Sequence, residues 1–236
     1  MEKIALITGA NKGIGFEIAK LLAGQGVTTI VGARDEERGR AAAERLGQPY
    51  VRLDVTDEQS VAAAAKWIDG EYGRLDILVN NAGVTGDPAG FLPSAATAAH
   101  LREVYETNVF GVVTVTNAML PLLRRSPAGR IVNMSSELGS LAMAADPASP
   151  FAEVNIVGYN SSKSALNMIT VGYAKELKDT PIKVNAANPG YCATDLNQHQ
   201  GFRTAEQGAA IAVKLATLDE NGPTAAFMED AGDVPW

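Results

Sequence analysis

The sequence is short of the residues on which several protein classes depend. It contains one cysteine, Cys192, in 236 residues, so no disulfide can form within the chain, and this usage fits a reducing compartment. No apolar run approaches the roughly 20 residues of a membrane-spanning helix. The chain also starts without a basic segment followed by an apolar one. We therefore expect a soluble, cytoplasmic protein.

Positive charge is also in deficit. The chain has 20 Lys and Arg residues against 27 Asp and Glu residues, which gives a net charge of -7. Nucleic acids and anionic membranes require a basic surface, so we expect neither as a partner. Separately, we expect no metal site. A chain of this length is sufficient for one good-sized core.

Short apolar runs alternate with helical patterns along the whole chain. This alternation predicts a parallel sheet with helices on both faces. We expect one doubly wound α/β domain over residues 1–236, with a nucleotide-binding half at about 1–100 and a catalytic and substrate half at about 101–236. Ligands of such sheets bind at the carboxyl ends of the strands. The seven predicted strands are residues 4–7, 27–33, 50–53, 75–79, 130–134, 182–186 and 224–228.

A glycine-rich turn follows the first predicted strand. Its residues are Thr8-Gly9-Ala10-Asn11-Lys12-Gly13-Ile14-Gly15, and a helical pattern begins within it. Such a turn brings backbone N–H groups and a helix N-terminus against a phosphate group. Glycine is required where a side chain would block the phosphate or the contact between strand and helix. The turn therefore predicts a nucleotide site; the alternative is a glycine-rich turn without a ligand.

Tyr159 and Lys163 begin a second informative stretch, a helical pattern over residues 159–178. A separation of four residues places both side chains on one helical face. An isolated tyrosine has a pKa near ~10, and a cation beside it favours the phenolate, which helps the hydroxyl to exchange a proton. The alternative is a half-buried tyrosine with a solvated lysine.

These stretches together resemble the short-chain dehydrogenase/reductase family. The chain is also similar to the carbonyl-reductase-like, NADPH-dependent subgroup, in its interval of 23 positions between Ser136 and Tyr159 and in its terminal Trp236. The resemblance implies a Rossmann-type fold and an oxidoreductase. The matching motifs are Thr8-Gly9-x-x-x-Gly13-x-Gly15, Asn80-Asn81-Ala82-Gly83, Ser136 after the fifth strand, and Tyr159-x-x-x-Lys163.

The resemblance implies a catalytic set of Asn108, Ser136, Tyr159 and Lys163. Ser136 would orient and polarise a carbonyl oxygen, and Tyr159 would protonate it. Lys163 would lower the pKa of the tyrosine and hold the nicotinamide ribose, while Asn108 would support a water path to Tyr159. Asn108 is a poor helix former within the helical stretch 101–123. Such a conflict is typical of functional positions; the alternative is a buried asparagine that satisfies backbone groups.

The cofactor prediction depends on the tip of the second strand. An acidic residue there would bind the ribose 2′-hydroxyl of NAD, whereas Arg34 can pair with a 2′-phosphate through two donors. Lys12 adds a second cation, and we assign Asp35 to the N-cap of a helix over residues 36–46. We therefore predict NADP(H) rather than NAD(H). The full predicted cofactor set is Gly9, Asn11, Lys12, Gly13, Ile14, Gly15, Arg34, Asp54, Val55, Asn81, Ala82, Gly83, Tyr159, Lys163, Pro189, Gly190 and Thr194.

The substrate is less defined than the cofactor. Its pocket would be formed by three loops, residues 84–96, 138–157 and 191–203. Their sequences do not identify the substrate. We expect a ketone, aldehyde or quinone, with the direction of reaction and the oligomeric state left open. The alternatives are a β-ketoacyl-carrier-protein reductase, which the acidic charge disfavours, and a non-catalytic NADP(H)-binding sensor, which would typically lack the tyrosine or the lysine.

Smaller features complete the predictions. We expect Cys192 to be a small buried residue, His100 to lie at the start of a helix and His199 to lie in an exposed loop. Capping boxes are predicted at residues 56–59 and 204–207.

Overall fold

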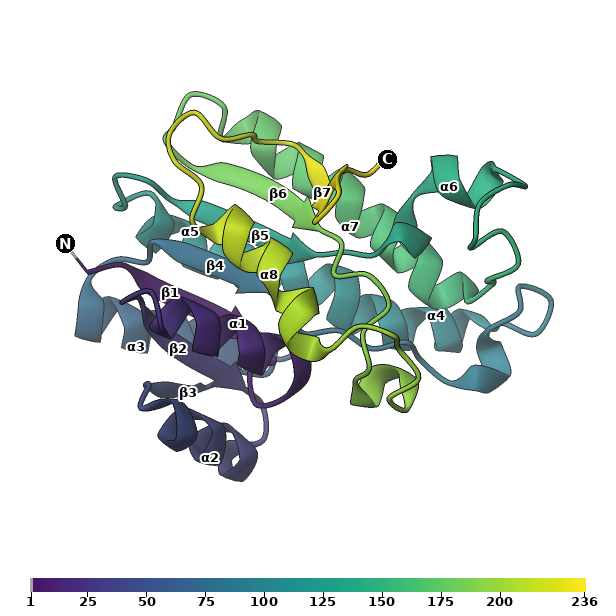
Figure 1. The fold of residues 1–236 in the computed structure, drawn as a ribbon. Coiled ribbons are helices and arrows are strands. Elements are labelled where there is room, and N and C mark those ends of the chain that lie inside the picture. Colours follow the sequence, from purple (N-terminus) through teal and green to yellow (C-terminus); the bar gives the residue numbers. More distant parts are fainter. Residues whose placement is uncertain (1) are drawn as a thin grey trace.

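The computed structural model describes residues 2–236 as one sheet with helices on both faces (Figure 1). Met1 lies outside the described residues. The strand order is β3-β2-β1-β4-β5-β6-β7-β8, and all neighbours are parallel except β7 and β8. The strands are β1 (Ile4–Thr8), β2 (Thr28–Ala33), β3 (Tyr50–Arg52), β4 (Ile77–Asn80), β5 (Arg130–Met134), β6 (Lys183–Ala187), β7 (Phe227–Glu229) and β8 (Gly232–Asp233).

This sheet confirms the predicted doubly wound α/β fold. It contains eight strands where about seven were predicted, because the chain folds back after β7 into the short antiparallel β8. The strand order reverses at β1, which lies between β2 and β4. The carboxyl ends of β1 and β4 therefore form the switch point at which ligands of doubly wound sheets bind.

Helices cover both faces of the sheet, with α1 (Gly13–Ala23) and α8 (Ala205–Ala216) in front of it and α5 (Gly111–Leu123) and α7 (Val157–Glu176) behind it in Figure 1. Short 3₁₀ turns are η1 (Pro88–Gly90), η3 (Glu137–Gly139) and η4 (Asp195–Asn197), and η2 (Glu106–Phe110) is a π-helical turn. The helices are α1 (Gly13–Ala23), α2 (Glu36–Leu46), α3 (Glu58–Tyr72), α4 (Ala98–Tyr105), α5 (Gly111–Leu123), α6 (Leu141–Ala145), α7 (Val157–Glu176) and α8 (Ala205–Ala216).

Two hydrophobic clusters hold these layers together. Side chains alternate along β1, so that Ala5 and Ile7 join one cluster, whereas Ile4 and Leu6 join the other. This is the period of two expected of a strand, here with both faces buried. A fully buried residue such as Leu22 contributes about 1.5–3 kcal/mol of burial energy.

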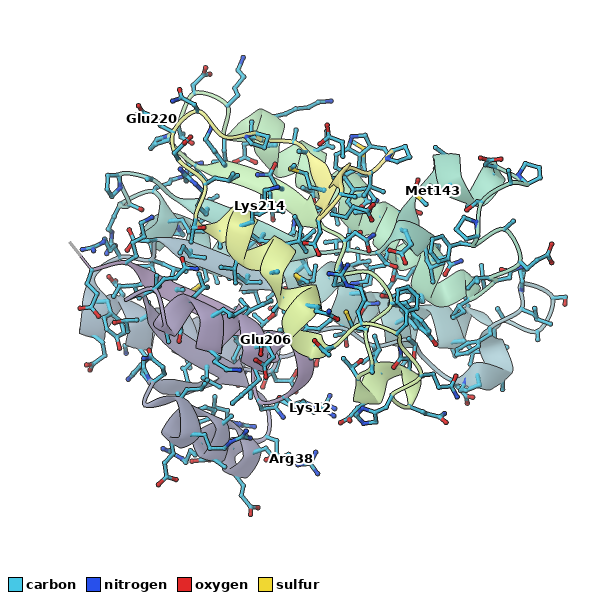
Figure 2. The ribbon with its side chains drawn as sticks, in the orientation of Figure 1. Lys12, Arg38, Met143, Glu206, Lys214 and Glu220 are labelled. Atoms are coloured by element: carbon cyan, nitrogen blue, oxygen red, sulfur yellow. The ribbon has the colours of Figure 1, made fainter. Side chains whose placement is uncertain are left out.

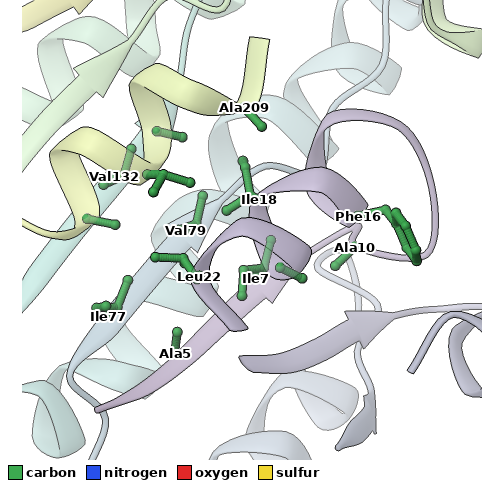
Figure 3. Packing of buried hydrophobic residues seen from close by; sticks show 14 of the residues in the cluster. Ala5, Ile7, Ala10, Phe16, Ile18, Leu22, Ile77, Val79, Val132 and Ala209 are labelled. Carbon is green, nitrogen blue, oxygen red and sulfur yellow. The ribbon is translucent and has the colours of Figure 1, made fainter. Parts of the chain in front are cut away.

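Figure 3 shows the first cluster from close by. Ile18 and Leu22 of α1 lie near Ile7 of β1 and Val79 of β4, and Ala209 of α8 completes this part of the packing. The two helices are thereby fixed over the switch point. This packing positions the glycine turn at the N-terminus of α1.

Two of the three predicted helix N-caps are confirmed and one is wrong. Asp35 caps α2 as predicted, since its Oδ1 accepts a hydrogen bond of 3.0 Å from Arg38 N. The 204–207 capping box is also confirmed. The 56–59 box is wrong, because Asp57 caps α3 through Gln59 N at 2.9 Å. A carboxylate at this position also interacts favourably with the positive end of the helix dipole.

The helical stretch predicted over 101–123 is interrupted at its middle. It consists of α4, the π-helical turn η2 and α5. No helix within residues 2–236 combines the length and the apolar character that crossing a membrane would require.

The insertion before α7, residues 138–157, packs against the C-terminus. Ala142 N donates to Trp236 O at 3.1 Å, and the Trp236 ring stacks on Phe227 with centroids 5.5 Å apart. Met143 packs against the small cluster that contains Phe227 and Val234. The insertion and the end of the chain therefore form one side of the molecule, next to α7 (Figure 1).

Candidate active site

Asn108 lies in the π-helical turn between α4 and α5 and is fully buried. Its Nδ2 donates to Val84 O at 2.9 Å and to Ser162 Oγ at 3.0 Å, and its Oδ1 accepts from Val84 N at 2.9 Å. Both amide hydrogens are therefore used. The side chain joins the loop after β4 to α7, and the π turn, a feature frequent at functional sites, is what directs it there.

Lys163 is buried beside Tyr159 on α7, with 5% of its surface exposed. Its Nζ donates to Met134 O at 2.7 Å and lies 5.5 Å from the centroid of the Tyr159 ring. Burial of the ammonium group lowers the pKa of Lys163 to about 8. A Cβ atom on Gly83 would lie 3.7 Å from this Nζ, an ordinary van der Waals contact, so the loop after β4 lies directly beside the cation.

Ser136 follows β5 and lies next to Tyr159. Burial raises the pKa of the Tyr159 hydroxyl to about 12, a hydrogen bond with Ser136 lowers it by a smaller amount, and the charge of Glu137 raises it. The net direction is upward, because desolvation of the phenolate outweighs the favourable hydrogen bond. At neutral pH Tyr159 therefore carries its proton and can act as an acid.

The glycine turn is held against the turn after β4. Thr8 Oγ1 accepts from Asn81 N at 2.9 Å and from Ala82 N at 3.0 Å, and Asn81 Nδ2 donates to Thr8 O at 2.9 Å. A Cβ atom on Gly15 would lie 2.4 Å from Asn81 Nδ2 and 2.7 Å from Gly9 O. Glycine at position 15 is thus required by this close approach.

The start of α1 fits the phosphates of a dinucleotide. Gly9 and Gly13 adopt φ values of +65° and +57°, which favour glycine. The first turn of α1 has no side-chain cap and no acidic residue, so its N–H groups and the helix dipole are available to an anion. Thr194, from the segment after β6, opposes this turn, since a Cβ atom on Gly13 would lie 3.8 Å from Thr194 Cγ2.

The predicted residues on the segment after β6 reach the same edge of the sheet. Gly190 has a φ of +69° and follows Pro189, whose carbonyl accepts a hydrogen bond of 3.3 Å from Cys192 Sγ. Cys192 is buried as predicted. The Nε2 of the exposed His199 lies 2.9 Å from Asp195 Oδ1.

Charged groups lie around the tip of β2. Arg34 is exposed directly after the strand, and Asp35 is engaged both in capping α2 and in an ion pair with Arg38, whose Nε lies 3.5 Å from Asp35 Oδ2. Sequence reasoning missed Arg38 as a further cation here; Figure 2 shows it below Lys12 at this end of the molecule. The signal was available, because a cation in the first turn of a helix is unfavourable to the helix dipole.

The remaining predicted residues follow β3. Asp54 Oδ1 accepts from Thr56 N at 3.0 Å and from Thr56 Oγ1 at 2.8 Å, and Val55 is buried against Gly111 at the start of α5. The structure therefore brings the turns after β1, β2, β3, β4, β5 and β6 to one edge of the sheet, together with Tyr159 and Lys163.

Comparison with known proteins agrees with this arrangement. A family model described as short chain dehydrogenase matches residues 3–204. The chain belongs to the short-chain dehydrogenase family. It is therefore an oxidoreductase of a family that uses nicotinamide cofactors.

Individual members of the family resemble this chain over nearly its full length. It is 40% identical to the short-chain dehydrogenase anuI of Penicillium roqueforti, over 95% of this chain and 91% of the relative. It is 32% identical to carbonyl reductase [NADPH] 1 of Bos taurus, over 99% and 98% of the two chains. The structure of salutaridine reductase from Papaver somniferum superimposes with a TM-score of 0.83 at 30% identity, over 97% of this chain and all of that one.

Proposed function

We propose that this oxidoreductase reduces the carbonyl group of a ketone, aldehyde or quinone to an alcohol, with NADPH as the cofactor and Tyr159 as the general acid. The observation that carries the proposal is the placement of Tyr159 and the buried Lys163 on one face of α7, with the Lys163 Nζ 5.5 Å from the centroid of the tyrosine ring and bonded to Met134 O at the end of β5, directly before Ser135 and Ser136. A tyrosine hydroxyl held beside a cation suits protonation of a carbonyl oxygen.

The residues present fit a dinucleotide. The glycine turn and the N-terminus of α1 would hold the pyrophosphate, Asp54 and Val55 would contact the adenine, and Lys163 with the loop after β4 would hold the nicotinamide ribose. When bound, NADPH supplies the hydride. The protein would orient the cofactor and the substrate and would stabilise the charges that develop during the reaction.

Ser136 would hold the substrate oxygen and polarise the carbonyl. The Tyr159 hydroxyl would donate its proton to that oxygen as negative charge develops on it. The buried ammonium group of Lys163 would then stabilise the tyrosine oxygen after proton loss. Asn108 would support the path that returns a proton to Tyr159, and its bonds to Val84 and Ser162 would fix α7 relative to the loop after β4.

NADPH is favoured over NADH by the charges near β2. Arg34 can form a bidentate pair with a 2′-phosphate. Asp35 opposes that phosphate less than an unpaired acid would, because it caps α2 and pairs with Arg38. The name of the bovine relative, carbonyl reductase [NADPH] 1, agrees with this choice.

The test is consumption of reduced nicotinamide with a panel of ketones, aldehydes and quinones, measured with NADPH and NADH side by side. We expect turnover of at least one carbonyl, with a clear preference for NADPH. The matched control is Tyr159→Phe, which should bind the cofactor but lose nearly all turnover. Cofactor binding without turnover of any carbonyl by the native protein would favour a sensor, and preference for NADH would contradict the assignment of Arg34.

A further inference from the structure

Asn167 is a buried polar side chain on α7, four positions after Lys163 and eight after Tyr159. At these spacings the three side chains follow one face of the helix. Asparagine is a poor helix former, and a buried amide is costly without hydrogen-bond partners. Both the oxygen and the nitrogen of the Asn167 amide have a partner. The positions of those partners therefore indicate what the residue does.

The two partners of Asn167 lie on either side of Ser136 in the chain. Ser135 Oγ donates to Asn167 Oδ1 at 2.6 Å, and Asn167 Nδ2 donates to Gly139 O at 3.3 Å. The first partner comes one residue before Ser136 and the second comes three residues after it. One amide on α7 therefore holds both ends of the short segment 135–139.

Segment 135–139 is a tight turn that includes the Ser136 hydroxyl. Ser136 Oγ accepts a hydrogen bond of 3.2 Å from Leu138 N, and Ser136 O accepts one of 2.9 Å from Gly139 N. The first of these bonds uses a lone pair of the hydroxyl oxygen, so the hydroxyl hydrogen can still be donated to another group. A shift of Gly139 would move the turn to which this hydroxyl is bonded.

The same segment is in direct contact with the turn of α7 that carries Lys163. A Cβ atom on Gly139 would lie 2.6 Å from Lys163 Cβ and 3.0 Å from Ser164 N. Ser164 Oγ also donates to Gly139 O at 2.9 Å. The glycine is thus required for the close approach, and its carbonyl accepts hydrogen bonds from two side chains of the helix.

The opposite side of segment 135–139 is bonded to β6 and to the residue that follows it. Ser135 N donates to Ala187 O at 2.8 Å, and Glu137 N donates to Asn188 Oδ1 at 3.3 Å. These bonds fix the segment to the sheet. They do not fix its distance from α7, which depends on the side chains of that helix.

We propose that Asn167 is a positioning residue that acts through Ser136, by fixing the Ser136 hydroxyl relative to Tyr159 and Lys163. The serine follows β5 and the other two lie on α7, so the three groups reach one substrate oxygen only if the turn and the helix keep their spacing. A displacement of about 1 Å between reacting groups costs on the order of 100-fold in rate. The inference rests on the proposed function, because that function gives Ser136 its role.

The first measurement is kcat and KM for a carbonyl substrate with NADPH, normalised to the number of cofactor-binding sites. Asn167→Ala should lower kcat by on the order of 10-fold to 100-fold. The KM for NADPH should change little, because the glycine turn and the tip of β2 are not altered.

Thr170→Val is the matched control for this measurement. Thr170 is also fully buried on α7, and its Oγ1 accepts from Asn133 Nδ2 of β5 at 2.8 Å, outside segment 135–139. Its replacement also breaks a buried hydrogen bond between α7 and β5. We expect a comparable loss of stability with kcat close to the native value. A loss of kcat equal to that in Asn167→Ala would overturn the proposal.

The second measurement tests whether Asn167 acts through Ser136. In a Ser136→Ala background, Asn167→Ala should lower kcat by less than about 2-fold, because the hydroxyl that it positions is already absent. An asparagine with a merely structural role would lower kcat by the same factor in both backgrounds, and that result would contradict the assignment.

Hydrogen exchange provides a readout that requires no substrate. The amide hydrogens of Leu138 and Gly139 should exchange faster in Asn167→Ala than in the native protein, because the turn that protects them is no longer held on α7. Thr170→Val should leave their exchange unchanged. If Asn167→Ala does not fold, Ser135→Ala removes one of the two bonds and should act in the same direction.

The exchange result separates this inference from the proposed function. Unchanged exchange at Leu138 and Gly139 in the Asn167 variant would overturn the assignment of Asn167, whatever the activity of the native protein. Faster exchange in the variant, with no turnover of any carbonyl by the native protein, would count only against the proposed function.

Discussion

The Nζ of Lys12 lies 2.5 Å from Oδ2 of Asp195. This ion pair joins the glycine turn after β1 to the segment after β6, across the carboxyl edge of the sheet. Both side chains are about half exposed, so the pair contributes little to stability. The pair matters because it occupies the ammonium group of Lys12, which we assign to cofactor binding.

Replacing Asp195 should therefore change cofactor affinity. In Asp195→Asn, Lys12 is released and can pair with phosphate, so we expect a KM for NADPH that is a few-fold lower, while the KM for NADH changes less. The measurement is the KM of both cofactors at low and high salt, since screening should reduce the difference. Lys12→Gln is the control and should raise the KM for NADPH. An Asp195→Asn variant with unchanged KM values would show that the pair does not compete with the cofactor.

Arg34 should determine the preference between the two cofactors. In Arg34→Ala a charge-assisted pair with the 2′-phosphate is lost, which corresponds to about 1.5–3 kcal/mol, or roughly 10-fold to 150-fold in kcat/KM for NADPH. The value for NADH should change little. Arg40→Ala is the matched control, because Arg40 is exposed on α2 and pairs with Glu36. Equal losses with both cofactors would instead indicate a structural role for Arg34.

Gly15 should tolerate no side chain. In Gly15→Ala the new Cβ meets the backbone oxygen of Gly9 and the Asn81 amide at distances below 3.0 Å, so the glycine turn must move. We expect a loss of stability of about 1–3 kcal/mol and weaker cofactor binding, measured by urea denaturation and by cofactor titration.

Gly70→Ala provides the contrast for that experiment. Gly70 lies within α3 and nothing lies within 4 Å of its Cβ position, so alanine should stabilise the protein by about 0.5–1 kcal/mol. If both alanine variants were equally stable, the close approach at Gly15 would not be a constraint.

Buried Lys163 should make stability depend on pH. Its pKa in the folded protein is lowered from 10.5 to about 8, so between these values the unfolded chain binds more protons than the folded one. The free energy of unfolding should therefore rise with pH across this window, relative to Lys163→Met, which lacks the group. Urea denaturation of both proteins between pH 7.5 and 10 measures the difference, which should reach on the order of a few kcal/mol. A constant difference across this window would contradict the lowered pKa.

Several features followed from the sequence because their causes are local. The strand β5 was predicted with its observed bounds, since a short apolar run leading into Ser135-Ser136 defines it. Asp35 was correctly assigned as an N-cap, because that role depends on its position before a helix. The choice between Thr56 and Asp57 failed for a related reason: both can cap a helix, and the order of preference depends on how the chain turns after β3.

The sequence by itself determined the doubly wound fold and the types of residue at the site, because alternating strands and helices and the glycine turn depend on neighbours in the chain. Only the tertiary structure decided how those residues interact. Lys12 and Asp195 are 183 positions apart, and Asn108 finds Ser162 only after α7 is packed. The pKa of Tyr159 rises because folding removes its hydroxyl from water, and desolvation is a property of the packed protein that no local pattern encodes.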